Sequence, residues 1–376
     1  MARSLISRFA VLSIAGSLSA GMAVLPSTPG GAEPRHDEGA RVTNCNSSGS
    51  GSLADAVAGA RSGSTITISA SCSSENPITP ADVITIGTSL TIKASRSERA
   101  VISGGTTHSI FTVAPGAVVS LEGLTLRDGH QGTFSFVIGG GAIQNGGTLS
   151  LIHDAFINNS SFVGGAVSNT GSLTVDGCTF RTGSAYVGSS ILSSQGSVRI
   201  SNSEISDNWA IFGTLFLVGS AFTIRHSVVT RNKAYLSGGI FVSGDPAVSS
   251  LLISDSTISD NQGGQAGGGL TVGGVPATIE HSTISNNTAT DGAGIENESG
   301  ALTVRDSVFS GNTASGQGGA IFSNGESASV AVNSSRFSNN AGASLPTKYP
   351  GIYIFSGTLK VRGSDFGSSR DGDSDR

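Results

Sequence analysis

The sequence has little charge and few aromatic or cysteine residues, and each shortage narrows the class of protein. Charged residues make up 12% of the 376 positions, about half the usual fraction of roughly 25%. No interior stretch approaches the ~18 consecutive apolar residues that a membrane-spanning helix needs. The net charge is −5 and the body of the chain has no cluster of basic residues, so nothing indicates a nucleic-acid partner.

Glycine and short aliphatic patterns are abundant instead. There are 54 glycines, about twice the usual usage of roughly 7%. Val, Ile and Leu recur at regular spacings, which argues against a disordered chain. This composition is typical of many short strands joined by turns of small residues.

The N-terminus has the pattern of a secretory signal peptide. Arg3 and Arg8 precede the apolar stretch "FAVLSIAGSLSAGMAVL", and small residues follow it up to Ala32. We expect a signal peptide over 1–32 and a polar linker over 33–41. Cleavage after Ala23 also fits, and the alternative is an anchor that is never removed. The chain is therefore expected to be secreted or associated with the cell envelope, with no membrane span after signal removal and a disordered polar tail over 367–376.

Three cysteines occur, at positions 45, 72 and 178. In an exported protein, Cys45 and Cys72 are candidates for a disulfide at the start of the mature chain, but their spacing alone leaves the pairing open. Closing a loop of that length would contribute about 3 kcal/mol. Cys178 belongs to the internal repeat.

An eleven-residue pattern recurs through most of the chain: apolar, any, apolar, two polar, small, any, apolar, any, any, Asn. One copy is "LTVRDSVFSGN", and successive copies begin 24 to 29 residues apart. Most copies are followed by a glycine-rich segment such as "GGAV" or "GGAIF". The copies begin at Leu149, Leu173, Val198, Phe222, Leu251, Ala277, Leu302, Val330 and Leu359.

A unit of about 25 residues with three short strands and three turns predicts one coil of a parallel β-helix. We expect an all-β, single-stranded right-handed parallel β-helix over 42–366, with about a dozen coils. The segment 51–63 has helical spacing, with Ser52 as N-cap, and is expected to cap the first coil. Equivalent residues of stacked coils should form ladders: a serine ladder that includes Cys178, and an asparagine ladder.

The repeats resemble those of a known group. "GGAI" paired with "FxxN", seen at 156–159, 309–312 and 337–340, is similar to the repeat signature of the chlamydial polymorphic membrane proteins. The stretch from Val42 to Ser69 resembles the start of many exported right-handed β-helix repeat proteins, whose fold is a solenoid of the pectate-lyase type. The resemblance implies an exported surface protein, although those relatives resemble autotransporters and carry a C-terminal barrel that the sequence here does not show.

One polar row is a candidate catalytic or metal site. Polysaccharide lyases and hydrolases on β-helices place carboxylates on adjacent coils, and equal repeat positions are spatial neighbours. In four successive coils, the position before the ladder serine alternates between histidine and aspartate. The alternative is a solvated turn whose opposite charges relieve repulsion between coils. No cofactor or metal is expected. The row consists of His226, Asp255, His281 and Asp306.

A second candidate is a strip of aromatic side chains that recurs at coil spacing after the asparagine ladder. Aromatic faces at this spacing are suited to stacking on sugar rings or to anchoring a protein partner. The alternative is that these rings complete the core where loops are longer. The candidate ligand-binding residues are Phe162, Tyr186, Trp209, Phe212 and Tyr235.

The patterns together favour a monomeric, non-enzymatic binding or adhesion protein that recognises a polysaccharide or a cell-surface protein. A polysaccharide lyase or glycoside hydrolase is the second hypothesis, and a structural envelope component the third, because β-helices host all three functions.

Overall fold

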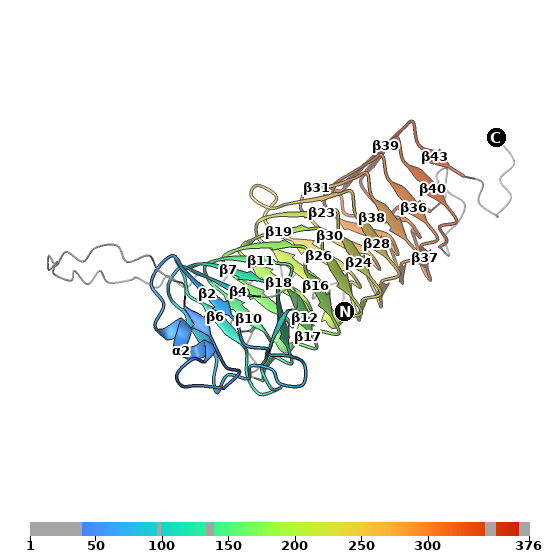
Figure 1. Ribbon diagram of the computed structural model, residues 1–376. Coiled ribbons are helices and arrows are strands. Elements are labelled where there is room, and N and C mark those ends of the chain that lie inside the picture. The colour runs from blue at the N-terminus through green and yellow to red at the C-terminus, as the bar shows by residue number, and fades with distance from the viewer. Residues whose placement is uncertain (1–39, 96–98, 133–138, 343–350, 368–376) are drawn as a thin grey trace, which may run out of the picture. The chain divides into compact units, whose positions relative to one another are not determined.

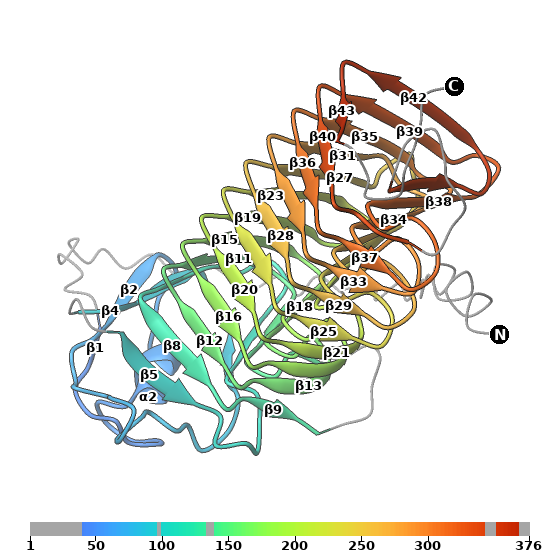
Figure 2. The ribbon, with the colours of Figure 1, turned by 90° about the vertical axis from the view of Figure 1, so that its right-hand side faces the viewer.

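The chain from Ala40 onward winds into a right-handed parallel β-helix. The computed structural model describes residues 40–95, 99–132, 139–342 and 351–367. Each coil in the middle of the solenoid contributes one strand to each of four sheets, and the strand pairings are parallel and in register, as Leu149 with Leu173 and then Val198. Figures 1 and 2 show the coils stacked along one axis. The predicted signal peptide 1–32, most of the linker and the tail from 368 onward lie outside the described residues.

We number the sheets in the order in which a coil visits them. Within the described ranges, sheet 1 has 13 strands and sheet 2 has 11. The strands of sheet 1 are β1 (Arg41–Val42), β2 (Ser64–Ile68), β4 (Leu90–Ala94), β7 (Val118–Glu122), β11 (Thr148–Ile152), β15 (Ser172–Asp176), β19 (Ser197–Ser201), β23 (Ala221–Arg225), β27 (Ser250–Ser254), β31 (Ala277–Glu280), β35 (Ala301–Arg305), β39 (Ser329–Asn333) and β42 (Thr358–Arg362). Those of sheet 2 are β5 (Ala100–Ser103), β8 (Leu124–Arg127), β12 (Ala155–Ile157), β16 (Thr179–Arg181), β20 (Glu204–Ser206), β24 (Val228–Thr230), β28 (Thr257–Ser259), β32 (Thr283–Ser285), β36 (Val308–Ser310), β40 (Arg336–Ser338) and β43 (Asp365–Phe366).

Among the described residues, sheet 3 has 8 strands and sheet 4 has 11. The strands of sheet 3 are β9 (His130–Gln131), β13 (Ser160–Val163), β17 (Ser184–Val187), β21 (Trp209–Phe212), β25 (Lys233–Ala234), β29 (Gln262–Gly263), β33 (Thr288–Ala289) and β37 (Thr313–Ala314). Those of sheet 4 are β3 (Ile84–Ile86), β6 (Phe111–Val113), β10 (Ile143–Asn145), β14 (Val167–Asn169), β18 (Ile191–Ser194), β22 (Leu215–Val218), β26 (Ile240–Ser243), β30 (Leu270–Gly273), β34 (Ile295–Glu298), β38 (Ile321–Asn324) and β41 (Ile352–Ile354).

The core is a column of aliphatic and phenylalanine side chains inside the coils. Strand residues alternate between inward and outward positions, so β39 buries Val330 and Val332 and leaves its other residues partly exposed. Because the coils are in register, inward rings stack on each other, as Phe156 on Phe180 with centroids 4.5 Å apart. The apolar period of two in the repeat therefore determines which face of each strand is buried.

The glycine pairs of the repeat form the turn from sheet 3 to sheet 4. Gly164 has φ +66°, a backbone conformation that favours glycine. At Gly165 a Cβ would lie 2.1 Å from the carbonyl oxygen of Ser189 on the next coil. Both residues thus need glycine, the first for its dihedral angle and the second because two coils approach closely.

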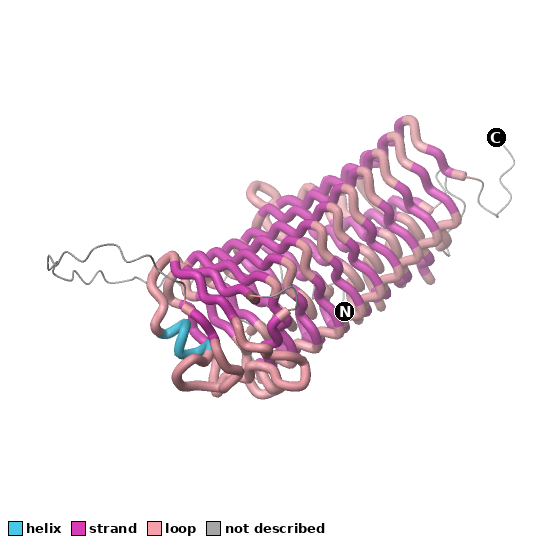
Figure 3. Tube along the Cα trace, viewed as in Figure 1, coloured by secondary structure: helices cyan, strands magenta, loops and turns pink. Residues whose placement is uncertain are grey.

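One short helix, α2 (Leu53–Ala58), lies at the N-terminal end of the coils (Figure 3). Ser52 is its N-cap and accepts a hydrogen bond from the Asp55 backbone N–H, and Leu53 and Val57 are buried. The helix is shorter than the segment 51–63 because the chain turns after Gly59. Within the described ranges, no helix is long and apolar enough to cross a membrane.

A disulfide joins Cys45 to Cys72. It links the segment before α2 to the residues that follow β2, so it encloses the whole N-terminal cap. Cys72 is buried and Cys45 packs on the same core. The bond therefore ties the cap to the first coil.

Removing this disulfide is expected to loosen the cap. The Cys45→Ser/Cys72→Ser double variant should lose about 3 kcal/mol of stability, because the loop that it closes is freed in the unfolded chain. Hydrogen exchange should rise first in residues 41–68. Cys178→Ser is the control and should change exchange little. Equal exchange in the cap with and without the bond would contradict this expectation.

Candidate ligand-binding site

Two sharp corners of each coil determine where polar side chains point. Between sheets 1 and 2, and again between sheets 2 and 3, one residue adopts a left-handed backbone conformation and the next points inward. In one coil these left-handed residues are Asp255 (φ +50°) and Asp260 (φ +57°), followed by Ser256 and Asn261. Asp, Asn and His are enriched in this conformation among non-glycine residues. The corners therefore demand polar residues for backbone reasons alone.

The predicted serine ladder is confirmed at the first corner. Ser256 Oγ accepts a hydrogen bond from the Ser227 N–H at 3.1 Å and donates to the Ser254 carbonyl at 2.7 Å. Cys178 takes the same place two coils before Ser227, where its Sγ accepts from the Asp154 N–H at 3.3 Å. Burial raises the pKa of its thiol to about 12. Cys178 is therefore a small ladder residue and a poor nucleophile at neutral pH.

Asp154 extends this ladder by one coil and was not predicted from the sequence. It is fully buried, and its carboxylate accepts hydrogen bonds from the backbone N–H groups of Leu124 at 2.7 Å and Ile152 at 3.2 Å. Burial outweighs these bonds and raises the pKa of Asp154 to about 7. The sequence did indicate this place, because Asp154 stands at the serine position of the repeat copy that begins at Leu149.

The asparagine ladder is confirmed at the second corner. Asn261 Oδ1 accepts from both the backbone N–H and the side-chain amide of Asn232, each at 3.0 Å. Its own amide donates to the Val229 carbonyl and to Asn287 Oδ1. Every polar atom of this buried side chain is thus satisfied, which explains why Asn recurs here.

The row of candidate catalytic residues lies at the first corner, on the outside. His226, Asp255, His281 and Asp306 all have φ between 47° and 50° and are exposed. His281 Nε2 lies 3.9 Å from Asp306 Oδ2. Asp255 and Asp306 are two coils apart, with backbones separated by roughly 10 Å. The left-handed backbone by itself favours Asp and His at these positions.

No group of three or more His, Cys, Asp or Glu side chains that would hold a metal ion is present among the residues that the structure describes. One position earlier in the repeat, the Arg305 guanidinium donates to the Glu280 carboxylate. This ion pair bridges two successive coils.

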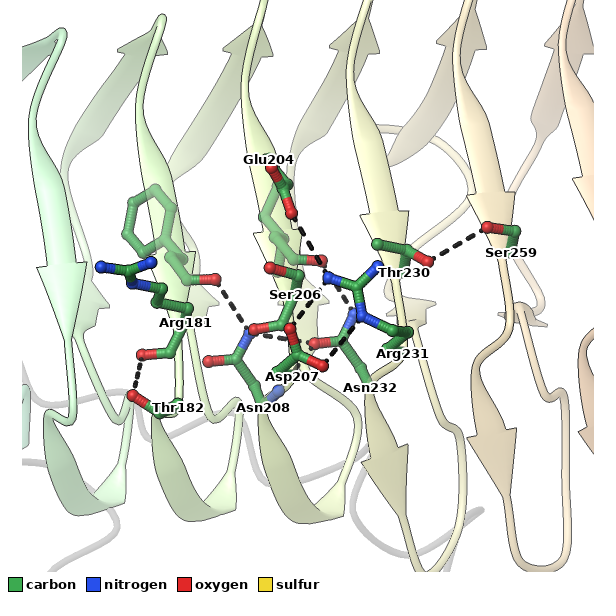
Figure 4. Close-up of polar contacts among 12 residues, drawn as sticks. Arg181, Thr182, Glu204, Ser206, Asp207, Asn208, Thr230, Arg231, Asn232 and Ser259 are labelled. Carbon is green, nitrogen blue, oxygen red and sulfur yellow. Dashed lines mark hydrogen bonds and ion pairs between the residues drawn. The ribbon is translucent and has the colours of Figure 1, made fainter.

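A further ion pair lies at the second corner, as Figure 4 shows. Arg231 donates Nε and Nη2 to the two oxygens of Asp207, at 3.0 and 2.9 Å, and lies 3.6 Å from Glu204. The hydrogen bond from Arg231 lowers the pKa of Asp207. The pair is exposed, so it contributes at most about 1 kcal/mol to stability. The Arg231 guanidinium is therefore already paired with carboxylates of the protein.

The aromatic candidates lie on or beside sheet 3, but they are not equivalent. Phe162 and Tyr186 stack on each other with centroids 4.9 Å apart, and the Phe212 ring lies 5.3 Å from that of Tyr186. Phe162 and Phe212 also pack, together with Phe216, against a small buried cluster of Val163, Val187 and Leu192. These three rings mainly contact one another.

Trp209 and Tyr235 differ because their rings are open. They are 52% and 57% exposed, and within the described part of the chain neither has an aromatic ring stacked on it. By register, Trp209 lies beside Ser184 on one coil and Lys233 on the next, and Tyr235 follows Lys233 by two residues. Gln265 Nε2 donates to the Tyr235 hydroxyl at 2.8 Å. Lys233 and Gln265 were not identified from the sequence.

Comparisons with protein families and with solved structures each found a match. The A-module of the mannuronan C-5 epimerase AlgE6 of Azotobacter vinelandii matches 88% of this chain and 100% of its own, with 12% identity and a TM-score of 0.34. No curated protein matches. The protein family described as right handed beta helix region matches residues 236–366, which agrees with the parallel β-helix seen in the structure.

Proposed function

We propose that this protein is a secreted or envelope-associated binding protein, and that Trp209 and Tyr235 form a platform for a polysaccharide on the outer face of sheet 3. The observation that carries the proposal is the exposure of these two rings, 52% and 57%, on consecutive coils. Large exposed aromatic side chains are rare among the described residues, and exposed rings of this kind mark binding surfaces.

The surroundings of the two rings favour a sugar over an apolar protein surface. The neighbours in the same outward row are Ser184, Lys233 and Gln262, which offer hydroxyl, ammonium and amide groups. A sugar ring presents an apolar face edged by hydroxyls, so it can stack on an indole while it bonds to such side chains. Rings that are separated by polar residues suit this pattern better than a continuous apolar contact.

An extracellular location is part of the proposal. The Cys45–Cys72 disulfide supports it, because disulfides persist mainly in oxidising compartments. The predicted signal peptide and the resemblance to chlamydial surface proteins point in the same direction. The solenoid supplies a rigid scaffold on which the rings keep fixed positions.

Binding to immobilised polysaccharides tests the proposal. Trp209→Ala should weaken binding by a factor of about 30 and Tyr235→Ala by about 10, because aromatic side chains that become buried under a ligand contribute much of the binding energy. Phe355→Ala is the matched control, because Phe355 is also exposed (67%) but belongs to the turn after β41. Unchanged affinity in both sheet 3 variants, or no binding to any glycan by the native chain, would refute the platform.

A further inference from the structure

Lys233 lies next to both open rings. It is exposed, it stands in register with Trp209 on the following coil, and parallel neighbours are about 4.8 Å apart between backbones. Tyr235 lies two residues further along the same coil, just past the end of β25, and both residues are exposed whereas Ala234 between them is buried. The ammonium group is thus placed at the edge of the proposed platform.

Sheet 3 is otherwise almost free of charge. Leaving histidine aside, Lys233 is the one charged residue in its eight described strands, and none of those strands contains Asp or Glu. Within the described residues Lys233 makes no ion pair. The nearby cation on the other side of the corner, Arg231, is held by Asp207 and Glu204. Lys233 therefore remains the cation available to a ligand on the platform.

We infer that the ligand of this platform is an anionic glycan, whose carboxylate or sulfate binds the Lys233 ammonium while a neighbouring sugar ring stacks on Trp209. The inference rests on the proposed function and specifies its ligand class. A positive group without a carboxylate beside it attracts an anion and gives an interaction that salt weakens. A neutral glycan would leave that charge without a partner.

Gln265 acts as a positioning residue in this arrangement. Its amide donates to the Tyr235 hydroxyl from the following coil, which favours one rotamer of the Tyr235 side chain. Gln265→Ala should lower affinity about three-fold while leaving the preference for anionic over neutral glycans unchanged, because the ammonium group is untouched.

The experiment compares matched pairs of polymers on the native chain by biolayer interferometry. One pair is polygalacturonate and its carboxyl-reduced, neutral counterpart, and the other is dextran sulfate and dextran. We expect one anionic member to bind at least ten-fold more tightly than its neutral partner, with affinity falling as salt is raised from 50 to 300 mM. The pair that shows the difference identifies carboxylate or sulfate as the bound group.

Lys233→Gln should abolish that ten-fold preference and the salt dependence while weak binding to the neutral member persists. Arg199→Gln is the matched control, because Arg199 is an exposed cation on the outer face of sheet 1. Equal binding of the charged and neutral members by the native chain, sensitive to Trp209→Ala, would overturn the inference and leave the platform intact. A preference that survives Lys233→Gln would overturn it as well. If none of the polymers binds, the proposed function itself is refuted.

Discussion

Asn261→Ala is expected to destabilise the protein by about 2–6 kcal/mol. The substitution leaves the backbone N–H and the amide of Asn232 without their acceptor, and it removes the donor to the Val229 carbonyl. The Asn232 amide keeps its bond to the Ile205 carbonyl, so the main losses are at the Asn232 backbone N–H and the Val229 carbonyl. A buried polar group that loses its partner costs about 1–3 kcal/mol, which gives the range for the two. Equilibrium unfolding in urea, followed by circular dichroism, measures the change.

Asn333→Ala is the matched control, because Asn333 ends β39 with its side chain on the outer face. Its loss should lie within about 0.5 kcal/mol. Asn261→Asp should fall between the two, since it keeps an acceptor for Asn232 but cannot donate to Val229. Equal stability of Asn261→Ala and Asn333→Ala would show that the ladder does not stabilise the coils.

Asp154→Ser is expected to stabilise the protein at pH 8 and to have little effect at pH 4. The pKa of Asp154 is about 7 in the folded chain, above the ordinary value of 3.8, so the folded state binds more protons than the unfolded state between these values. The native free energy of unfolding should therefore fall as pH rises through this window, by up to about 1.4 kcal/mol per pH unit.

Serine does not ionise, so it removes the fall in the free energy of unfolding with rising pH. It also suits the position, because the other ladder serines accept from a backbone N–H and donate to a carbonyl as Ser256 does. Urea unfolding at pH 4, 6 and 8 tests the expectation. Asp176→Ser is the control. Hydrogen bonds from Ser201 and Asn202 lower the pKa of Asp176, so its stabilising contribution is lost only as pH falls. An Asp154→Ser variant that loses stability between pH 6 and 8 as steeply as the native protein would contradict this account.

The repeat made the architecture predictable. Leu302 and Val304 alternate with polar residues, and Ser307 and Asn312 follow at fixed offsets, so the local pattern already states which side chains enter the core. Stacking identical patterns leaves few alternatives to a parallel solenoid. The ladders were predictable for the same reason. A side chain whose hydrogen-bond partner is the same residue type on the next coil must recur in register.

The candidate site was only partly predictable. The sequence placed Tyr186, Trp209 and Tyr235 in one region, but it could not distinguish rings that stack on each other from rings that remain open. That difference depends on side-chain packing across coils whose loops vary in length. The polar row at Asp255 and His281 stays a prediction, because the left-handed backbone at these corners favours Asp and His whether or not they bind a ligand.

The sequence by itself thus determined the β-helix, the inward columns and the two ladders, because these follow from periodicity and register alone. Only the tertiary structure decided the rest: that Asp154 is buried where its charge is costly, that Arg231 is paired with Asp207, and that Lys233 lies beside Trp209 with no ion pair among the described residues. Solvation, ion pairing and ring exposure depend on which residues meet across neighbouring coils. A repeat pattern specifies the coil but not the particular side chains that differ from one coil to the next.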